Sequence, residues 1–341
     1  MRITRDTLLK LAQTTAAQRV KVSRRLVCIY LTGSVLSEEP LLGGTTDIDL
    51  VCIHDSQPLQ EREIVRLSDE VTLDISHYSQ ADFHQPRQLR VHPWLGYFIY
   101  SKPLLLHDTS HWFEFTQAST GAQFFQADFV LSRAKTLAES ARQLWIDLSF
   151  NDPGSHPRRV YAYLKALEQA GNALASLTGS PLTERRFVLQ FPQRMQTLQR
   201  ADLSKEWLDL LSGSVEVSDE SWTEWLGSWE LALKAVTAQQ EYPARLHPAR
   251  KGYYERAASA LWTEHPSAAF WLLMRTWTLA VAHLPAGHEA EASWMDACRA
   301  SNLDEATFST RLEGLDHYLD AVEETLDRFA EKNGVVTSPE M

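Results

Sequence analysis

Several features that mark other protein classes are scarce in this sequence. It contains only three cysteines, Cys28, Cys52 and Cys298, which lie far apart. Their spacing fits neither a zinc site nor a disulfide framework, so we expect buried, reduced thiols. No apolar run approaches the ~18 residues of a membrane-spanning helix. The N-terminus also lacks the apolar core and small-residue cleavage site of a secretory signal. These absences predict a cytoplasmic protein with no membrane partner.

An excess of positive charge is also missing. The chain has 33 lysines and arginines against 44 aspartates and glutamates, a net charge of -11. Binding to nucleic acid through phosphates normally needs a basic field, because counterion release drives much of the affinity. The balance therefore favours a small-molecule or protein partner, although a local basic groove can lie within an acidic total. Apart from Gly33-Ser34, no Gly-rich phosphate loop is present.

The first third of the chain shows the pattern of a mixed α/β domain. β-Branched and apolar runs predict strands, whereas apolar residues at helical spacing predict helices. The predicted strands cover 25–32, 48–53, 71–78 and 104–107, and the predicted helices cover 4–20, 60–67, 79–85 and 94–100. This order predicts an α+β fold in which a small mixed sheet has helices on one face.

After about residue 120 the pattern becomes helical. A break at positions 151–154 separates the first two long helices, and prolines and glycines punctuate the later ones. The predicted helices cover 123–148, 157–178, 183–200, 204–212, 219–240, 249–264, 266–283, 288–301 and 304–332. Trp222, Trp225 and Trp229 recur at helical spacing and are predicted to be core residues. We therefore expect two domains, at 1–115 and 120–333, the second a larger all-helical bundle.

Three features of the first domain fit one kind of chemistry. Gly33 and Ser34 follow a predicted strand, where backbone N–H groups and a hydroxyl can approach a phosphate. Asp47 and Asp49 begin the next strand, and because strand periodicity is two, both carboxylates face the same side. Asp74 lies in a later strand and can join them if the two strands are neighbours.

Such a group of carboxylates predicts a metal site. Three convergent negative charges need neutralisation, and oxygen ligands favour Mg²⁺, or Mn²⁺, over zinc. Two such ions can activate an attacking hydroxyl and stabilise a leaving pyrophosphate. The sequence therefore predicts two Mg²⁺ ions held by Asp47, Asp49 and Asp74.

These residues resemble the signature of the DNA-polymerase-beta-type nucleotidyltransferase superfamily. The strings TGSV and TDIDLV are separated by a short gap, and Asp74 follows Asp49 by 25 positions. The resemblance covers about residues 20–108. It implies that Gly33 and Ser34 hold the triphosphate. It also implies that Asp47 and Asp49 bind both metals and that Asp74 joins them at the catalytic metal.

The helical domain resembles, more loosely, that of the kanamycin and streptomycin nucleotidyltransferases. This likeness rests on the domain order and on the helix RRVYAYLKALEQAGNAL. In the superfamily, a helix after the first domain often offers a lysine to the triphosphate, and some members add a carboxylate as general base for the acceptor. Lys165 and Glu168, on one helix face, are the candidates for these two roles. The alternative is an ordinary surface ion pair between them. Arg185, followed by Arg186, can clamp phosphate or an anionic acceptor.

The sequence thus predicts transfer of a nucleoside monophosphate from a nucleoside triphosphate, with ATP the expected donor. The acceptor would be a hydroxyl of a small molecule, and pyrophosphate would be released. Three alternatives stay open: a toxin-like enzyme that adds nucleotides to tRNA, a non-catalytic nucleotide-binding regulator, and protein AMPylation. The tRNA alternative needs a basic stripe, for which the candidates are Arg158, Arg159, Arg185, Arg186 and Arg194.

Overall fold

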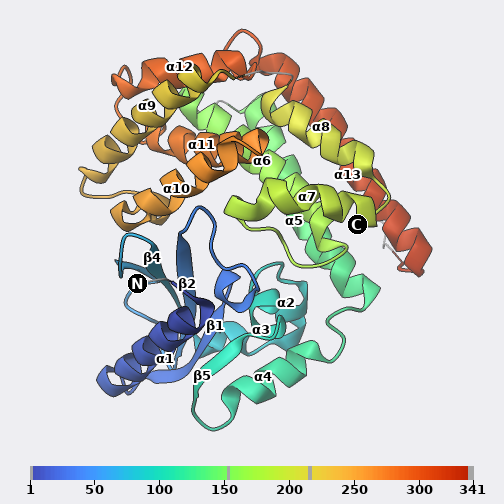
Figure 1. Ribbon diagram of the computed structural model, residues 1–341. Coiled ribbons are helices and arrows are strands. Elements are labelled where there is room, and N and C mark those ends of the chain that lie inside the picture. Colours follow the sequence, from blue (N-terminus) through green and yellow to red (C-terminus); the bar gives the residue numbers. More distant parts are fainter. Residues whose placement is uncertain (1–2, 152–153, 214–216, 337–341) are drawn as a thin grey trace. The chain divides into compact units, whose positions relative to one another are not determined.

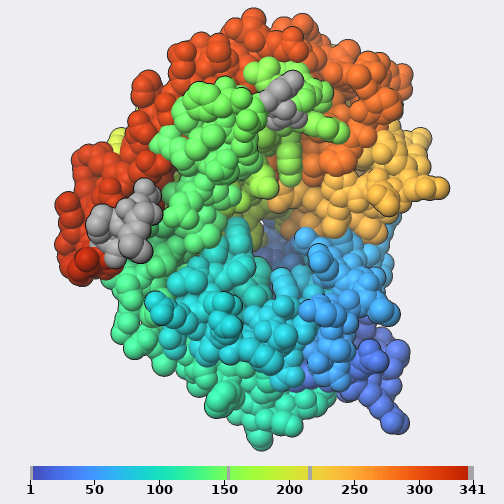
Figure 2. Space-filling model, turned by 180° about the vertical axis from the view of Figure 1, so that it is seen from behind, coloured from blue at the N-terminus to red at the C-terminus, as the bar shows by residue number. Residues whose placement is uncertain are grey.

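The computed structural model describes residues 3–151, 154–213 and 217–336 (Figure 1). The chain forms two compact units, of which the first comprises residues 1–124 with 249–260, and the second comprises 125–248 with 261–341. Figure 2 shows the surfaces of both units from behind, coloured along the chain. Of the predicted break at 151–154, Asp152 and Pro153 lie outside the described residues. Within the described ranges, no helix is both long and apolar enough to cross a membrane.

The first unit is built on one five-stranded mixed sheet. Its strands are β1 (Leu26–Thr32), β2 (Thr46–His54), β3 (Arg62–Arg66), β4 (Val71–Ser79) and β5 (Leu104–Asp108). The order across the sheet is β3-β4-β2-β1-β5. Only the central pair, β2 and β4, is parallel, and the other neighbours are antiparallel. The predicted α+β class and mixed sheet are therefore confirmed.

Both faces of the sheet are covered. Helix α1 (Arg5–Val22) packs against one face, where Leu8 and Ala12 join Ile48 and Leu50 of β2 in a buried core. On the other face lie η2 (Gln80–Phe83), α2 (Pro86–Val91), α3 (Leu95–Tyr100) and α4 (Trp112–Gly121). The prediction of helices on one face was wrong, because the alternating strands are apolar on both sides and α4 was not foreseen.

Strand β3 corrects the prediction of a helix over 60–67. The segment pairs antiparallel with β4, so that Arg62 stands opposite Ser76 and Ile64 opposite Asp74. Its β-branched Ile64 and Val65 suit a pleated strand, and the turn before Val71 brings the segment back along β4. Pairing with an existing strand outweighs the weak helical pattern of such a short segment.

A short segment from late in the chain belongs to the first unit. Residues 249–260 include most of α10 (Lys251–Trp262). Thr72 donates from Oγ1 to the carbonyl of Ala249 at 3.3 Å, and Thr45 donates to the carbonyl of Tyr253 at 3.4 Å. A Cβ at Gly43 would overlap the backbone of Arg256, so a glycine is needed for this close approach. Nothing in the sequence pattern predicted that this helix returns to the sheet.

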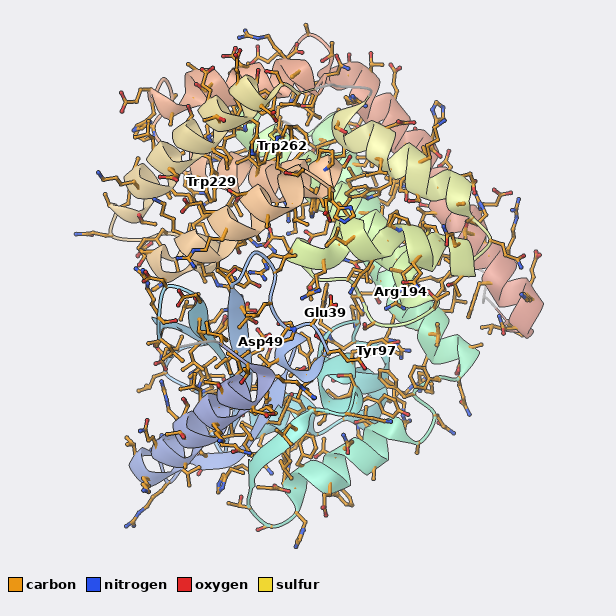
Figure 3. The ribbon with its side chains drawn as sticks, viewed as in Figure 1. Glu39, Asp49, Tyr97, Arg194, Trp229 and Trp262 are labelled. Carbon is orange, nitrogen blue, oxygen red and sulfur yellow. The ribbon has the colours of Figure 1, made fainter. Side chains whose placement is uncertain are left out.

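The second unit is helical, as predicted. Its helices are α5 (Ala127–Phe150), α6 (His156–Ser176), α7 (Phe187–Thr197), α8 (Ala201–Ser212), α9 (Asp219–Thr237), α11 (Pro266–Val281), α12 (Ala290–Ala300) and α13 (Phe308–Asn333), with the 3-10 turns η3 (Glu184–Arg186) and η4 (Ala244–Leu246). Trp222, Trp225 and Trp229 are buried, which confirms the predicted core stripe, and Trp229 lies among the helices in Figure 3. All three cysteines are free and buried, as predicted.

Candidate metal and nucleotide site

The turn after β1 brings backbone close to a carboxylate. Gly33 has a φ of 80°, a conformation that favours glycine, and it leads into the 3-10 turn η1 (Ser34–Leu36). A Cβ built on Gly33 would overlap Asp49 Oδ2 and lie 2.8 Å from Asp49 Cγ. Arg5 of α1 holds the turn by donating to the carbonyl of Val35 at 3.2 Å. The glycine is therefore required both by its φ and by the carboxylate beside it.

Ser34 lies at the start of η1. Its Oγ is 3.2 Å from Oγ1 of Thr46, the residue that precedes Asp47. Gly33 and Ser34 thus lie next to the start of β2, the strand that carries Asp47 and Asp49. The sequence predicted that this pair binds phosphate. Their role in binding phosphate stays a prediction.

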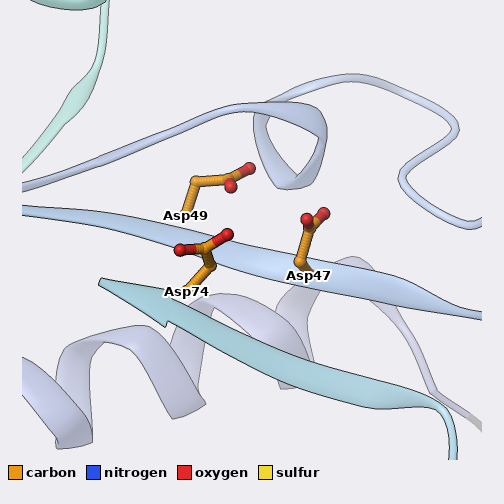
Figure 4. Close-up of side chains that lie close together, drawn as sticks. All are labelled: Asp47, Asp49 and Asp74. Atoms are coloured by element: carbon orange, nitrogen blue, oxygen red, sulfur yellow. The ribbon is translucent and has the colours of Figure 1, made fainter. Parts of the chain in front are cut away.

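The three aspartates lie on one face of the two central strands. Asp49 of β2 stands directly opposite Asp74 of β4 in the parallel register, and Asp47 is two residues earlier on β2. One oxygen from each carboxylate lies within 4.8 Å of the others. Figure 4 shows the three side chains projecting to the same side. The sequence predicted that Asp74 would join the pair if the strands were neighbours, and they are.

On β2, the carboxylates lie on a face of the sheet that is otherwise apolar. Val51 and Ile53 continue the same face of β2 and are buried against the helices that follow β4. The aspartates occupy the preceding positions of that face. Asp74 is 3% exposed and Asp47 is 8% exposed, so water screens their mutual repulsion only weakly. A buried cluster of this kind needs cations.

Two arginines that the sequence analysis missed supply positive charge. Arg62 of β3 donates to both oxygens of Asp74, from Nε at 2.7 Å and from Nη2 at 2.6 Å. Arg250, in the returning segment, also donates to Asp74 Oδ2, and its Nη2 lies 3.8 Å from Asp47 Oδ2. Neither arginine belongs to a recognisable motif. The only signal for Arg62 was its place near a strand that carries a predicted ligand.

Arg250 is itself deeply buried, with 6% of its surface exposed. Its Nη1 donates to the hydroxyl of Tyr254 at 3.3 Å, and its guanidinium lies 5.8 Å from the ring centroid of Tyr253. Burial acts to lower the pKa of Arg250, but its electrostatic interactions with Tyr254 and Asp47 outweigh burial and raise the pKa above its usual range. The guanidinium therefore stays positive at the carboxylate cluster.

The donor set fits a hard divalent cation. All three candidate ligands are carboxylates, and no cysteine or histidine is among them. Oxygen donors are the ligands preferred by Mg²⁺ and Mn²⁺. The cluster can therefore hold a metal ion, as the sequence predicted.

The other predicted nucleotide contacts do not belong to the unit that carries the carboxylates. Lys165 on α6 and Arg185 in η3 belong to the second unit, the first exposed and the second buried. Glu168 does not pair with Lys165: it is 9% exposed and accepts from Nη2 of Arg275 on α11 at 2.5 Å. The roles of Lys165 and Arg185 in binding nucleotide stay predictions.

No protein-family model and no curated protein matches this chain. A nucleotidyltransferase-like protein from Exiguobacterium sibiricum matches in a structural comparison, with 10% identity, 98% of this chain and 96% of that chain covered, and a TM-score of 0.34.

The sheet and its three carboxylates support the resemblance that the sequence predicts. A mixed sheet that presents three aspartates from two adjacent strands is typical of the DNA-polymerase-beta-type nucleotidyltransferases. The resemblance predicted from the sequence is therefore confirmed at the level of the fold and the triad. The substrate is a separate question.

Proposed function

We propose that the protein is a metal-dependent nucleotidyltransferase that moves a nucleoside monophosphate from a nucleoside triphosphate to a hydroxyl of a small molecule. The observation that carries the proposal is the group of three carboxylates within 4.8 Å, next to a glycine turn whose backbone reaches Asp49. In this reaction the acceptor oxygen forms a bond to the α-phosphorus. The bond between that phosphorus and the bridging oxygen breaks, and pyrophosphate leaves.

Each residue has a role in this proposal. Asp47 and Asp49 would hold the Mg²⁺ ions, and Asp74 would complete the site and assist loss of the acceptor proton. Bound divalent cations would neutralise phosphate charge and lower the pKa of the acceptor hydroxyl. The backbone of Gly33 and the hydroxyl of Ser34 bind the β- and γ-phosphates.

The nature of the acceptor is argued from charge. The chain has a net charge of -11, which disfavours a polyanionic acceptor such as tRNA and favours a neutral or cationic molecule. An aminoglycoside is an acceptor of this class, since it carries both hydroxyls and positive charges. ATP is the donor that we would test first.

Label transfer from each nucleotide tests the proposal. ATP, CTP, GTP and UTP labelled at the α-phosphate are incubated separately with Mg²⁺ and the protein. Pooled aminoglycosides, total tRNA and a cell lysate are offered as acceptors. The Asp47→Asn/Asp49→Asn variant is the matched control, since it keeps the size of both side chains and removes their charge.

Label on the aminoglycoside pool, absent from the control, is the expected result. Label on tRNA would overturn the small-molecule acceptor and retain the chemistry, and label on lysate protein would indicate AMPylation. Nucleotide and Mg²⁺ binding without transfer to any pool would favour a non-catalytic regulator.

A further inference from the structure

Arg250 lies where a bound cation would be needed. It donates to Asp74 Oδ2 and lies 3.8 Å from Asp47 Oδ2, so one guanidinium contacts two of the three candidate metal ligands. Arg62 also binds Asp74, but its side chain is 43% exposed, whereas that of Arg250 is 8% exposed. Arg250 is therefore the arginine that enters the cluster.

The contacts of Arg250 are incomplete. Its buried Nε has no hydrogen-bond partner among the described residues. A buried polar group without a partner costs free energy, so this guanidinium is held less tightly than a fully satisfied one. A divalent cation that binds three carboxylates at once offers a stronger electrostatic partner.

Polar contacts join the segment that carries Arg250 to the sheet. Thr72 and Thr45 donate to its carbonyls at 3.3 and 3.4 Å, and Arg256 lies 3.6 Å from Glu70 in a pair that is about half exposed. Exposed pairs of this kind add little stability. By contrast, the ion pair between Arg250 of this segment and Asp74 of the sheet is buried.

We propose that Arg250 is a built-in cation of the carboxylate cluster that competes with divalent metal, so that metal binding displaces it and loosens residues 249–260 from the sheet. In the metal-free protein, Arg250 would then occupy the carboxylate cluster and oppose metal binding. The apparent affinity for metal is lowered by the fraction of molecules in which Arg250 occupies the cluster. The inference rests on the proposed function only in taking the cluster as a metal site.

Manganese binding tests the competition. Free Mn²⁺ is measured by electron paramagnetic resonance as it is titrated into the full chain, with no nucleotide or acceptor present. Arg250→Met keeps much of the length and apolar volume of the side chain and removes its charge. Arg256→Met is the matched control, since it removes the same charge from the same segment at a position that contacts Glu70 instead of the cluster.

We expect Arg250→Met to raise the affinity for Mn²⁺ by about tenfold or more, because close charge pairs contribute at least that factor. Arg256→Met should stay close to the wild type. Unchanged or weaker Mn²⁺ binding in Arg250→Met would overturn the proposal, since Arg250 would then support the metal instead of competing with it.

A second measurement needs no variant. Hydrogen exchange of the wild-type chain is followed with and without saturating Mn²⁺. Peptides from 249–260 should exchange faster with the metal, while peptides from β1 should not change. Slower or unaltered exchange in 249–260 would overturn the proposal. A protein that passes both tests and transfers no nucleotide would contradict the proposed function and leave the competition standing.

Discussion

At the scale of single residues, the site depends on a glycine, Gly33, which has no side chain. Gly33 has a φ of 80°, and any Cβ there would overlap the carboxylate of Asp49. Gly44 has a similar φ of 73°, but nothing lies within 4 Å of its missing Cβ. The two glycines therefore separate the cost of the backbone conformation from the cost of the contact.

We expect Gly33→Ala to lower the melting temperature more than Gly44→Ala. Each substitution carries a strain of about 1–3 kcal/mol from the positive φ, and only the first also pushes Asp49 out of place. Nucleotide transfer should fall in Gly33→Ala and persist in Gly44→Ala. Equal melting temperatures and equal activities in the two variants would show that the contact with Asp49 is unimportant.

Some residues of the site could be predicted from the sequence, and others could not. Gly33, Ser34 and the three aspartates follow a local pattern, because a turn and a two-residue strand period can be recognised without the fold. Arg62 and Arg250 follow no such pattern. Arg250 reaches Asp74 from 176 positions away, and only the return of α10 to the sheet makes that contact. Long-range pairs of this kind are fixed by tertiary packing.

At the scale of elements, strands β2 and β4 carry a second polar pair on the face that packs against α1. His54 Nε2 and His77 Nδ1 are 2.9 Å apart, and Glu63, bound to Arg19 of α1, lies 3.8 Å from His77 Nε2. Burial lowers the pKa of both histidines, and His54 further lowers that of His77. Both rings are therefore neutral in the folded protein at neutral pH.

This pair predicts a loss of stability in mild acid. The unfolded chain takes up protons near the ordinary histidine pKa of about 6.5, whereas the folded chain takes them up only at lower pH. The free energy of unfolding should therefore fall as the pH drops below that value. Denaturant titrations between neutral pH and mild acid should show a smaller loss in His54→Gln/His77→Gln. The exposed His111→Gln is the control, and an identical loss in all three proteins would refute the assignment.

Helices α6 and α11 of the second unit are joined by a buried ion pair between Glu168 and Arg275. The Arg275 side chain is 1% exposed and lies 5.2 Å from the ring centroid of Tyr161. Because Lys165 and Glu168 are three residues apart in a helix, the sequence predicts that they lie on one helix face. It could not predict that Arg275, from another helix, takes the carboxylate instead.

We expect Glu168→Leu to destabilise the protein by about 3–5 kcal/mol, because it leaves a buried guanidinium without its partner. Adding Arg275→Met should recover most of that loss, and Lys165→Met, at an exposed position of the same helix, should change stability by less than about 0.5 kcal/mol. Chemical denaturation measures all three. A Glu168→Leu variant with unchanged stability and no transfer activity would instead support the general-base role.

At the scale of the whole molecule, the sequence predicts which kinds of unit are present, but not which unit each helix joins. Alternating strands followed by long amphipathic helices predict an α+β unit and a helical unit, and both are present. The sequence order could not reveal that residues 249–260 belong to the first unit, because a helical pattern does not state which surface the helix covers. The arginine that contacts the carboxylate cluster lies in that segment.

We propose foremost that the carboxylate cluster transfers a nucleotide. Paired reactions with ATP labelled at the α- or the γ-phosphate test it most directly, with the acceptor pool that gives the highest yield and with Asp47→Asn/Asp49→Asn beside the wild type. We predict that α-label moves to the acceptor while γ-label leaves as pyrophosphate, and that the variant does neither. γ-Label on the acceptor, or α-label transfer that persists in the variant, would contradict the account.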